Sequence, residues 1–266
     1  MACFYVAPLA LICAASLATP DIIGRPVYGW YTENFALVFQ STYLPVVLRT
    51  FAYAAIATVL SLLVGYPCAY AISRYGGRFK AALLLAVLVP WLADYLVRIY
   101  AWLQVLGHEG PVNSVLIRAG IGPVTLIGNP YALNLGLVYS FLPFMVLPIY
   151  VAIERIDPRI VEAARDLYAN PALVFRTVIL PLSLPGVFAG VLMTFVPVSC
   201  DYVNSSVLGG TSTTMIGQVI QAQYLTNSNY PTASALSFVL MAVLLIGVFA
   251  YARALGTEDV MKVAAR

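Results

Sequence analysis

Apolar residues run along this chain in six long blocks that are separated by short polar and charged stretches. A bilayer core needs roughly 20 consecutive apolar residues per helix, and every block after the first reaches that length. The first block is about one turn short, and the second is long enough to tilt or to begin as an interfacial helix. We therefore predict an all-α membrane protein with six transmembrane helices, over residues 2–18, 44–73, 81–106, 132–153, 184–207 and 232–255.

The first block has a competing interpretation as a cleaved signal peptide, because Ser16-Leu17-Ala18 is similar to a signal-peptidase site. No lysine or arginine precedes that site, so the basic region that usually opens a signal peptide is missing. We therefore expect an uncleaved helix. A start that has lost a cytoplasmic tail is a further alternative.

The composition agrees with a membrane protein and excludes several other classes. Hydrophobic residues make up 62% of the chain and charged residues 9%, whereas about a quarter of the residues in a soluble domain are charged. The formal net charge of +3 gives no electrostatic support for binding nucleic acid. The cysteines form no Cys-x-x-Cys motif and the single histidine, His108, lies in a loop, so we expect neither a metal site nor a Ser-His-Asp triad.

Positive charge predicts the orientation of the chain in the membrane. Ten basic residues fall on one side of the predicted spans and two, Arg25 and Arg118, fall on the other. This bias places both termini and the loop between the fourth and fifth blocks in the cytoplasm. The ten residues are Arg74, Arg78, Lys80, Arg155, Arg159, Arg165, Arg176, Arg253, Lys262 and Arg266.

The cytoplasmic loop at 155–181 carries two helix-start signals, Asp157-Pro158 and Asn170-Pro171. In each, a residue that caps a helix is followed by proline at the first helical position. The first signal predicts a short amphipathic helix over 158–168, with Ile160, Ala164 and Leu167 on one face.

The second signal predicts a further helical turn that carries Leu173 and Phe175. Bulky apolar residues near water are costly unless something covers them. Two interpretations follow from the residues alone: the apolar face docks on another protein, or it packs on the chain's own helices or on lipid headgroups.

The same loop resembles the coupling loop of permease subunits in ABC importers. Glu162-Ala163-Ala164 matches the start of that motif and Ile179-Leu180-Pro181 closely matches its end, whereas Tyr168 occupies the usual glycine position. A tyrosine there tolerates positive φ poorly, so the turn is expected to be reshaped. The resemblance implies that this loop docks on an ATPase through Glu162, Ala163, Ala164, Arg165, Asp166, Leu167, Leu173 and Phe175.

Segments elsewhere look like the spermidine/putrescine permeases, in particular the first of their two permease subunits. These segments include Val64-Gly65-Tyr66-Pro67, Leu96-Val97-Arg98-Ile99-Tyr100 and Leu208-Gly209-Gly210. The resemblance implies a type I ABC importer permease fold with a coupling helix between helices 4 and 5, one permease domain over 1–266 and a core at 44–254. Related branches that carry iron, sulfate or thiamine share several of these segments, so another small solute is the alternative.

The resemblance also implies the partners and the location. They are a second, distinct permease, two ATPase subunits that bind ATP and magnesium, and an extracellular substrate-binding protein, all at the inner cell membrane. This chain itself is expected to need no cofactor.

Charged residues inside the apolar blocks are costly, so each usually has a partner or a function. Asp94 and Arg98 lie one helical turn apart and can pair on one face, which makes a structural ion pair the simpler interpretation. Asp201 and Tyr202 lie late in the fifth block, where Asp201 either contacts substrate or caps the helix end in water.

A polyamine carries ammonium groups that are separated by methylenes, so it requires carboxylates and aromatic faces. Both kinds of side chain occur in the middle of the third block and late in the fifth. The candidate substrate path consists of Asp201, Tyr202, Trp91, Asp94 and Tyr95.

No phosphate-binding Gly-x-x-x-x-Gly-Lys-Ser/Thr motif occurs in the sequence, so energy from ATP must come from another polypeptide. A stand-alone channel or proton-coupled carrier is the second hypothesis, but the two halves show no evident repeat and intramembrane acids are few. A membrane enzyme would need clustered His, Cys or acidic residues, and the sequence offers none.

Overall fold

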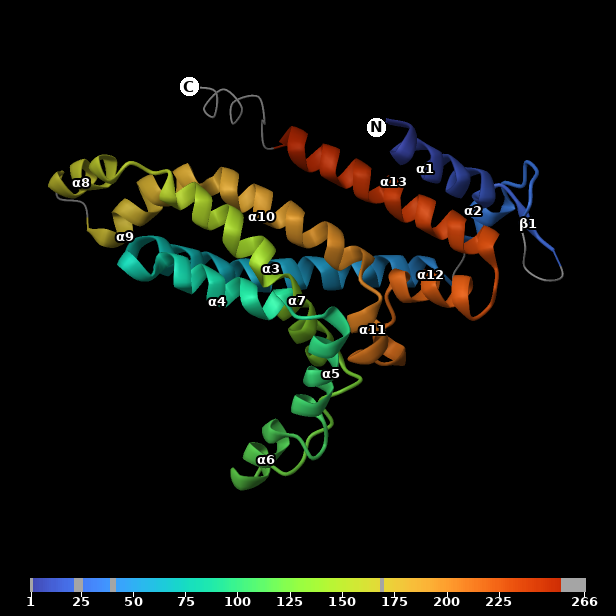
Figure 1. Ribbon diagram of the computed structural model, residues 1–266, viewed down its shortest axis with the longest axis horizontal. Helices are drawn as coiled ribbons and strands as arrows, with labels where there is room; N and C mark the ends of the chain where they lie inside the picture. The colour runs from blue at the N-terminus through green and yellow to red at the C-terminus, as the bar shows by residue number, and fades with distance from the viewer. Residues whose placement is uncertain (1, 22–25, 39–41, 168–169, 255–266) are drawn as a thin grey trace. The chain divides into compact units, whose positions relative to one another are not determined.

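The computed structural model describes residues 2–21, 26–38, 42–167 and 170–254. The described chain is mostly helical, and its strands form one short antiparallel pair, β1 (Thr19–Pro20) with β2 (Pro26–Val27). It divides into two compact units, residues 1–52 with 199–266 and residues 53–198, which are described in turn (Figure 1).

Every predicted apolar block is helical, which confirms the all-α membrane fold. Within the described residues, four helices are long and apolar enough to cross a bilayer: α3 (Leu44–Tyr75), α7 (Pro130–Glu154), α10 (Leu180–Cys200, continuous with the turns from Pro171) and α13 (Tyr230–Ala254). The third block is a bent pair of helices that together can make a fifth span. The first block, α1 (Ala2–Ser16), is shorter, as its sequence predicts.

The unit at 53–198 is built around α7. Met145, Val146, Ile149 and Ile153 of α7 are buried against α3 and α10. A Cβ atom on Gly186 of α10 would overlap with α7, so this glycine lets the two backbones approach closely.

The prediction of one continuous helix over 81–106 is wrong. A short 3-10 turn (Gly77–Phe79) leads into α4 (Lys80–Leu92), and α5 (Tyr95–Leu106) then leaves at a bend of 91°. The Asp94 carboxylate accepts hydrogen bonds from the backbone amides of Leu96 and Val97, at 2.9 and 3.3 Å, and so starts a new helix. Beyond α5, α6 (Pro111–Arg118) completes this arm (Figure 1).

The other unit pairs α1 with α13, and α2 (Glu33–Val38) packs on α13 as well. The fifth block ends earlier than predicted, since α10 stops at Cys200 and α11 (Val203–Val207) is a separate short helix. A 3-10 turn (Thr211–Thr213) leads to α12 (Ile216–Leu225), whose first amide, on Ile216, donates to the Thr50 hydroxyl at 2.8 Å.

Candidate functional site

The predicted loop helix begins at its predicted cap. α8 (Pro158–Asp166) starts with the Asp157 carboxylate accepting from the Arg159 amide at 2.9 Å. It ends at Leu167, and Tyr168, the residue at the usual glycine position, lies outside the described residues. The second start signal is also confirmed, because the Asn170 side chain accepts from the Leu173 amide at 2.7 Å at the head of α9 (Pro171–Val174). We call α8 and α9 together the coupling element.

One face of the coupling element packs on the chain itself. Val161 is 6% exposed and lies in a buried cluster with Ile156, Val174 and Ile179. Ala164 and Phe175 pack against this cluster and are half-buried. Self-packing is therefore correct for Ala164 and Phe175 but not for Ile160 and Leu167, which the sequence places on the same face as Ala164. The sequence reasoning missed Val161 as the central residue of the packed face.

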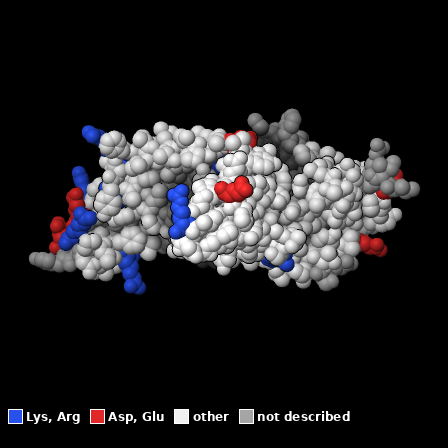
Figure 2. Space-filling view, turned by 90° about the horizontal axis from the view of Figure 1, so that it is seen from below, with Lys and Arg blue, Asp and Glu red and all other residues white. Residues whose placement is uncertain are grey.

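The opposite face carries exposed leucine and isoleucine side chains. Ile160 is 49% exposed and Leu167 is 81% exposed, and Leu173 is also exposed. The side chains of Glu162, Ala163, Arg165 and Asp166 are exposed around them. Figure 2 shows charged side chains gathered at the end of the molecule that carries α8 and α9. Such a surface combines apolar anchors with charges of both signs, as protein docking surfaces do.

Two sets of contacts tie this end of the unit to the long helices. The Phe175 ring lies edge-on between Tyr66 and Tyr70 of α3, with ring centroids 5.7 and 5.6 Å away. Glu154, the last residue of α7, accepts from Lys80 at 2.6 Å and from Ser73 at 2.7 Å. The ends of α3, α4 and α7 are thus joined beside the coupling element.

In the predicted substrate path, Trp91, Asp94 and Tyr95 come together at the α4–α5 bend. Trp91 is exposed and packs edge-on against Phe144, with ring centroids 5.2 Å apart. The expected Asp94–Arg98 ion pair is wrong: among the described residues, no salt bridge joins them. The reason is the bend, because it leaves carbonyls at the end of α4 without helical partners, and Arg98 donates to those of Trp91 and Ala93.

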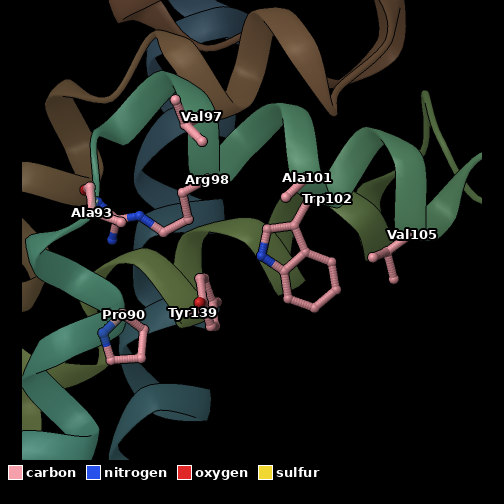
Figure 3. A pocket seen from close by; sticks show the side chains of 8 residues that line it. All are labelled: Pro90, Ala93, Val97, Arg98, Ala101, Trp102, Val105 and Tyr139. Atoms are coloured by element: carbon pink, nitrogen blue, oxygen red, sulfur yellow. The ribbon is translucent and has the colours of Figure 1, made fainter.

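A pocket of about 390 Å³ opens beside this bend, between α4, α5 and Tyr139 of α7 (Figure 3). Its wall is mostly apolar and includes the ring of Trp102, which packs edge-on against Tyr139 at 5.3 Å. Arg98 is 7% exposed and is the only charged residue in the lining. Trp91, Asp94 and Tyr95 do not line this pocket.

Asp201 and Tyr202 lie in the other unit, at the break between α10 and α11. Asp201 is buried, and its carboxylate accepts from the Asn204 amide at 2.8 Å and from the Asn204 side chain at 3.0 Å. The carboxylate therefore binds the first turn of α11 and is buried, which differs from both expected roles, a substrate contact and a cap of the helix end in water; Tyr202 is exposed. Among the described residues, no three His, Cys, Asp or Glu side chains are grouped as metal ligands are.

The chain is similar to known membrane transport proteins in sequence and in fold. Residues 61–255 match the model of the binding-protein-dependent transport system inner membrane component. The chain is 37% identical to the spermidine/putrescine transport system permease protein PotB of Haemophilus influenzae, over 94% of this chain and 88% of that one. It is 33% identical to PotB of Escherichia coli, over 94% and 92%. Among solved structures, a bacterial alginate ABC transporter in complex with a periplasmic protein carrying an alginate pentasaccharide matches with a TM-score of 0.72 at 19% identity, covering 94% of this chain and 88% of that one.

Proposed function

Because the chain belongs to the family of binding-protein-dependent transport system inner membrane components, we propose that it is the permease subunit of an ATP-driven polyamine importer, corresponding to the first of two permeases. The proposal rests on one observation above all. The loop between α7 and α10 is an ordered, capped helix pair with one face packed on the spans and the other exposed.

The exposed face fits a docking role. Leu167 and Leu173 are the apolar anchors, and Glu162, Arg165 and Asp166 supply a polar rim, with the small side chain of Ala163 also exposed. Two ATPase subunits would each grip one permease, and ATP with magnesium would bind to those subunits. Closure of the ATPase pair would then push the coupling element, and Val161 and Val174 would carry this movement into the spans. The permease performs no covalent chemistry.

The membrane arrangement follows from this docking. The coupling element and both termini lie on the cytoplasmic side of the inner membrane, which agrees with the excess of basic residues there. The whole chain acts as a single permease domain with its core at 44–254. A second permease, distinct from this one, completes the path, and an extracellular binding protein delivers the solute.

The polyamine assignment comes from the names of the similar permeases and from the chemistry at the α4–α5 bend. Asp94 and Trp91 are both exposed at this bend, whereas the ring of Tyr95 already faces the Arg98 guanidinium at 5.3 Å. A carboxylate next to aromatic faces suits an alkyl ammonium group. Asp201 is a weaker candidate because it is buried and already accepts hydrogen bonds from Asn204, so at the α10–α11 break Tyr202 is the more accessible residue.

Transport by the reconstituted complex tests this function. The permease pair and the ATPases are placed in proteoliposomes, and uptake of radiolabelled spermidine and putrescine is measured with the loaded binding protein and ATP. Thiamine, sulfate and ferric ion serve as competing solutes. We expect ATP-dependent uptake of the polyamines alone. Uptake by this chain without ATP would instead support a channel or carrier, and uptake of another solute would contradict the polyamine assignment.

A further inference from the structure

The ring of Phe175 is held by two tyrosines of a spanning helix. Tyr66 and Tyr70 lie four residues apart on α3, and therefore on one face of it. Each ring meets Phe175 at an interplanar angle of 89°, which is the favoured edge-to-face geometry of aromatic pairs. Phe175 is thus a point of ring contact between the segment leaving the coupling element and α3, and Tyr70 also packs against the cluster of Val161 and Val174.

Tyr66 also joins α3 to α10. Its hydroxyl lies 2.8 Å from the hydroxyl of Ser183, which is fully buried. The Ser183 proton is used in a bond to the Leu180 carbonyl at 3.0 Å, so Tyr66 is the donor and Ser183 the acceptor. One tyrosine therefore contacts Phe175 through its ring and α10 through its hydroxyl.

The backbone at Phe175 is unusual. Residues Phe175–Ile179 form a π-helical turn between α9 and α10. Such turns are rare, occur often at functional sites, and bend helices where they occur. A π-turn here allows the coupling element to tilt relative to α10, while Phe175 remains between the two tyrosines.

We propose that the aromatic cluster of Tyr66, Tyr70 and Phe175, together with the Tyr66–Ser183 hydrogen bond, makes α3 follow the coupling element when the ATPases close. Phe175 and Tyr66 are positioning residues in this proposal, which rests on the proposed function. Docking strength and force transmission are then separate properties, carried by residues that are close in sequence. Leu173 points outward and serves docking, whereas Phe175 packs inward and serves transmission.

The variants that separate these properties are Phe175→Ala, Phe175→Leu and Tyr66→Phe in the complete permease–ATPase complex. Phe175→Leu keeps an apolar side chain but loses the ring. Leu173→Ala provides the docking contrast. Tyr150→Phe is the matched control for Tyr66→Phe, because it also removes one hydroxyl from a half-buried tyrosine of this unit, and no hydrogen bond of that hydroxyl occurs among the described residues.

Three measurements are made on each complex: co-purification of the ATPases, ATP hydrolysis, and polyamine taken up per ATP. For Phe175→Ala we expect normal co-purification and continued hydrolysis, with uptake per ATP lowered about tenfold because two ring contacts are lost. Phe175→Leu should give an intermediate loss, and Tyr66→Phe a loss of about threefold, since only one hydrogen bond is removed. Tyr150→Phe should match the wild type, whereas Leu173→Ala should release the ATPases.

Hydrogen–deuterium exchange gives a readout that depends on movement of α3. In the wild-type complex, ATP should change the exchange of the α3 peptide that contains Tyr66 and Tyr70, and in Phe175→Ala this change should disappear. Normal uptake per ATP in Phe175→Ala, release of the ATPases by it, or an unchanged exchange response would each overturn the proposal. A wild-type complex that moves no polyamine would count against the proposed function, and the exchange response of α3 would still decide the role of Phe175, because it needs no solute.

Discussion

Three aspartates lie at helix starts, one in the cytoplasmic loop and two inside apolar blocks. The sequence predicts the helix start in the loop but not the two inside the blocks. Asp157 starts α8 in the cytoplasmic loop, and Asp94 and Asp201 lie at the starts of α5 and α11, inside apolar blocks. In all three, a carboxylate oxygen accepts from a backbone amide two or three residues later, at 2.8 to 2.9 Å. Only Asp157 carries a helix-start signal in the sequence, because proline follows it; for Asp201, capping a helix end is one of two alternatives.

The difference shows how an acidic residue in an apolar run should be interpreted. The expected roles for Asp94 and Asp201 were an ion pair, a substrate contact or a helix end. In the structure each marks a place where one helix stops and another begins, and the carboxylate satisfies amides that the break exposes. A substrate contact then has to be argued in addition to capping, and exposure decides between the two residues: Asp94 is exposed and Asp201 is buried.

The largest effect is expected at the exposed face of the coupling element. Glu162→Arg reverses one charge on the docking surface, where a like-charge or unmatched pair is costly. We expect ATPase co-purification and polyamine uptake to fall by more than about tenfold. Glu109→Arg makes the same change at another exposed position and should leave both unchanged. Equal behaviour of the two variants would refute the docking assignment.

A second prediction separates charge from capping at the α4–α5 bend. Asparagine caps helices about as well as aspartate, so Asp94→Asn should keep α5 intact while removing the negative charge. We expect polyamine uptake to fall roughly fivefold, as one cation contact is weakened, with no change in the melting temperature. Asp201→Asn should change uptake less, because that side chain is buried.

The capping control for this prediction is alanine. Asp94→Ala and Asp157→Ala should each lower the free energy of unfolding by about 1 kcal/mol, which is typical of a lost cap. Thermal unfolding in detergent measures this loss. If Asp94→Asn leaves uptake normal, the charge at this position has no role in transport. If it destabilises the protein as much as Asp94→Ala does, the loss of uptake belongs to the lost cap and the charge assignment fails.

The sequence predicts a structural feature well when the residues that determine it are close together in the chain, and poorly when they are far apart. The caps and the helical coupling element follow from local patterns such as Asn170-Pro171 and are confirmed, and four of the six predicted spans are, within the described residues, helices of sufficient length and apolarity. The bend at Asp94 is hidden, because 26 mostly apolar residues are typical of one span and an acidic residue among them fits an ion pair or a substrate contact as well as a break. The contacts of Phe175 with Tyr66 and of Glu154 with Lys80 join residues far apart in sequence, so no local pattern contains them.

A third prediction concerns the two faces of α8. Val161 and Ile160 are neighbours with similar side chains, but only Val161 is buried. Val161→Ala should lower the free energy of unfolding by about 2 kcal/mol, because it leaves a cavity in the cluster with Val174 and Ile179. Ile160→Ala should cost less than about 0.5 kcal/mol while weakening ATPase binding. Chemical unfolding of the reconstituted permease measures both losses. A larger loss for Ile160→Ala than for Val161→Ala would show that the inward face of α8 has been assigned wrongly.

The smallest effect is expected at the ion pair between Lys80 and Glu154, which joins α4 to α7. The nitrogen and oxygen lie 2.6 Å apart, but the side chains are 31% and 39% exposed, so water weakens their attraction. Lys80→Met should therefore lower the free energy of unfolding by only about 0.5 kcal/mol. In about 1 M salt, where the Debye length is near 3 Å, this difference should shrink further.

Ser73→Ala removes the neutral hydrogen bond to the same carboxylate and should respond less to salt. A large, salt-independent loss in Lys80→Met would contradict this expectation. It would show that the pair is shielded from water, so that removing Lys80 leaves the Glu154 charge buried without a partner, as for a charge inside a span.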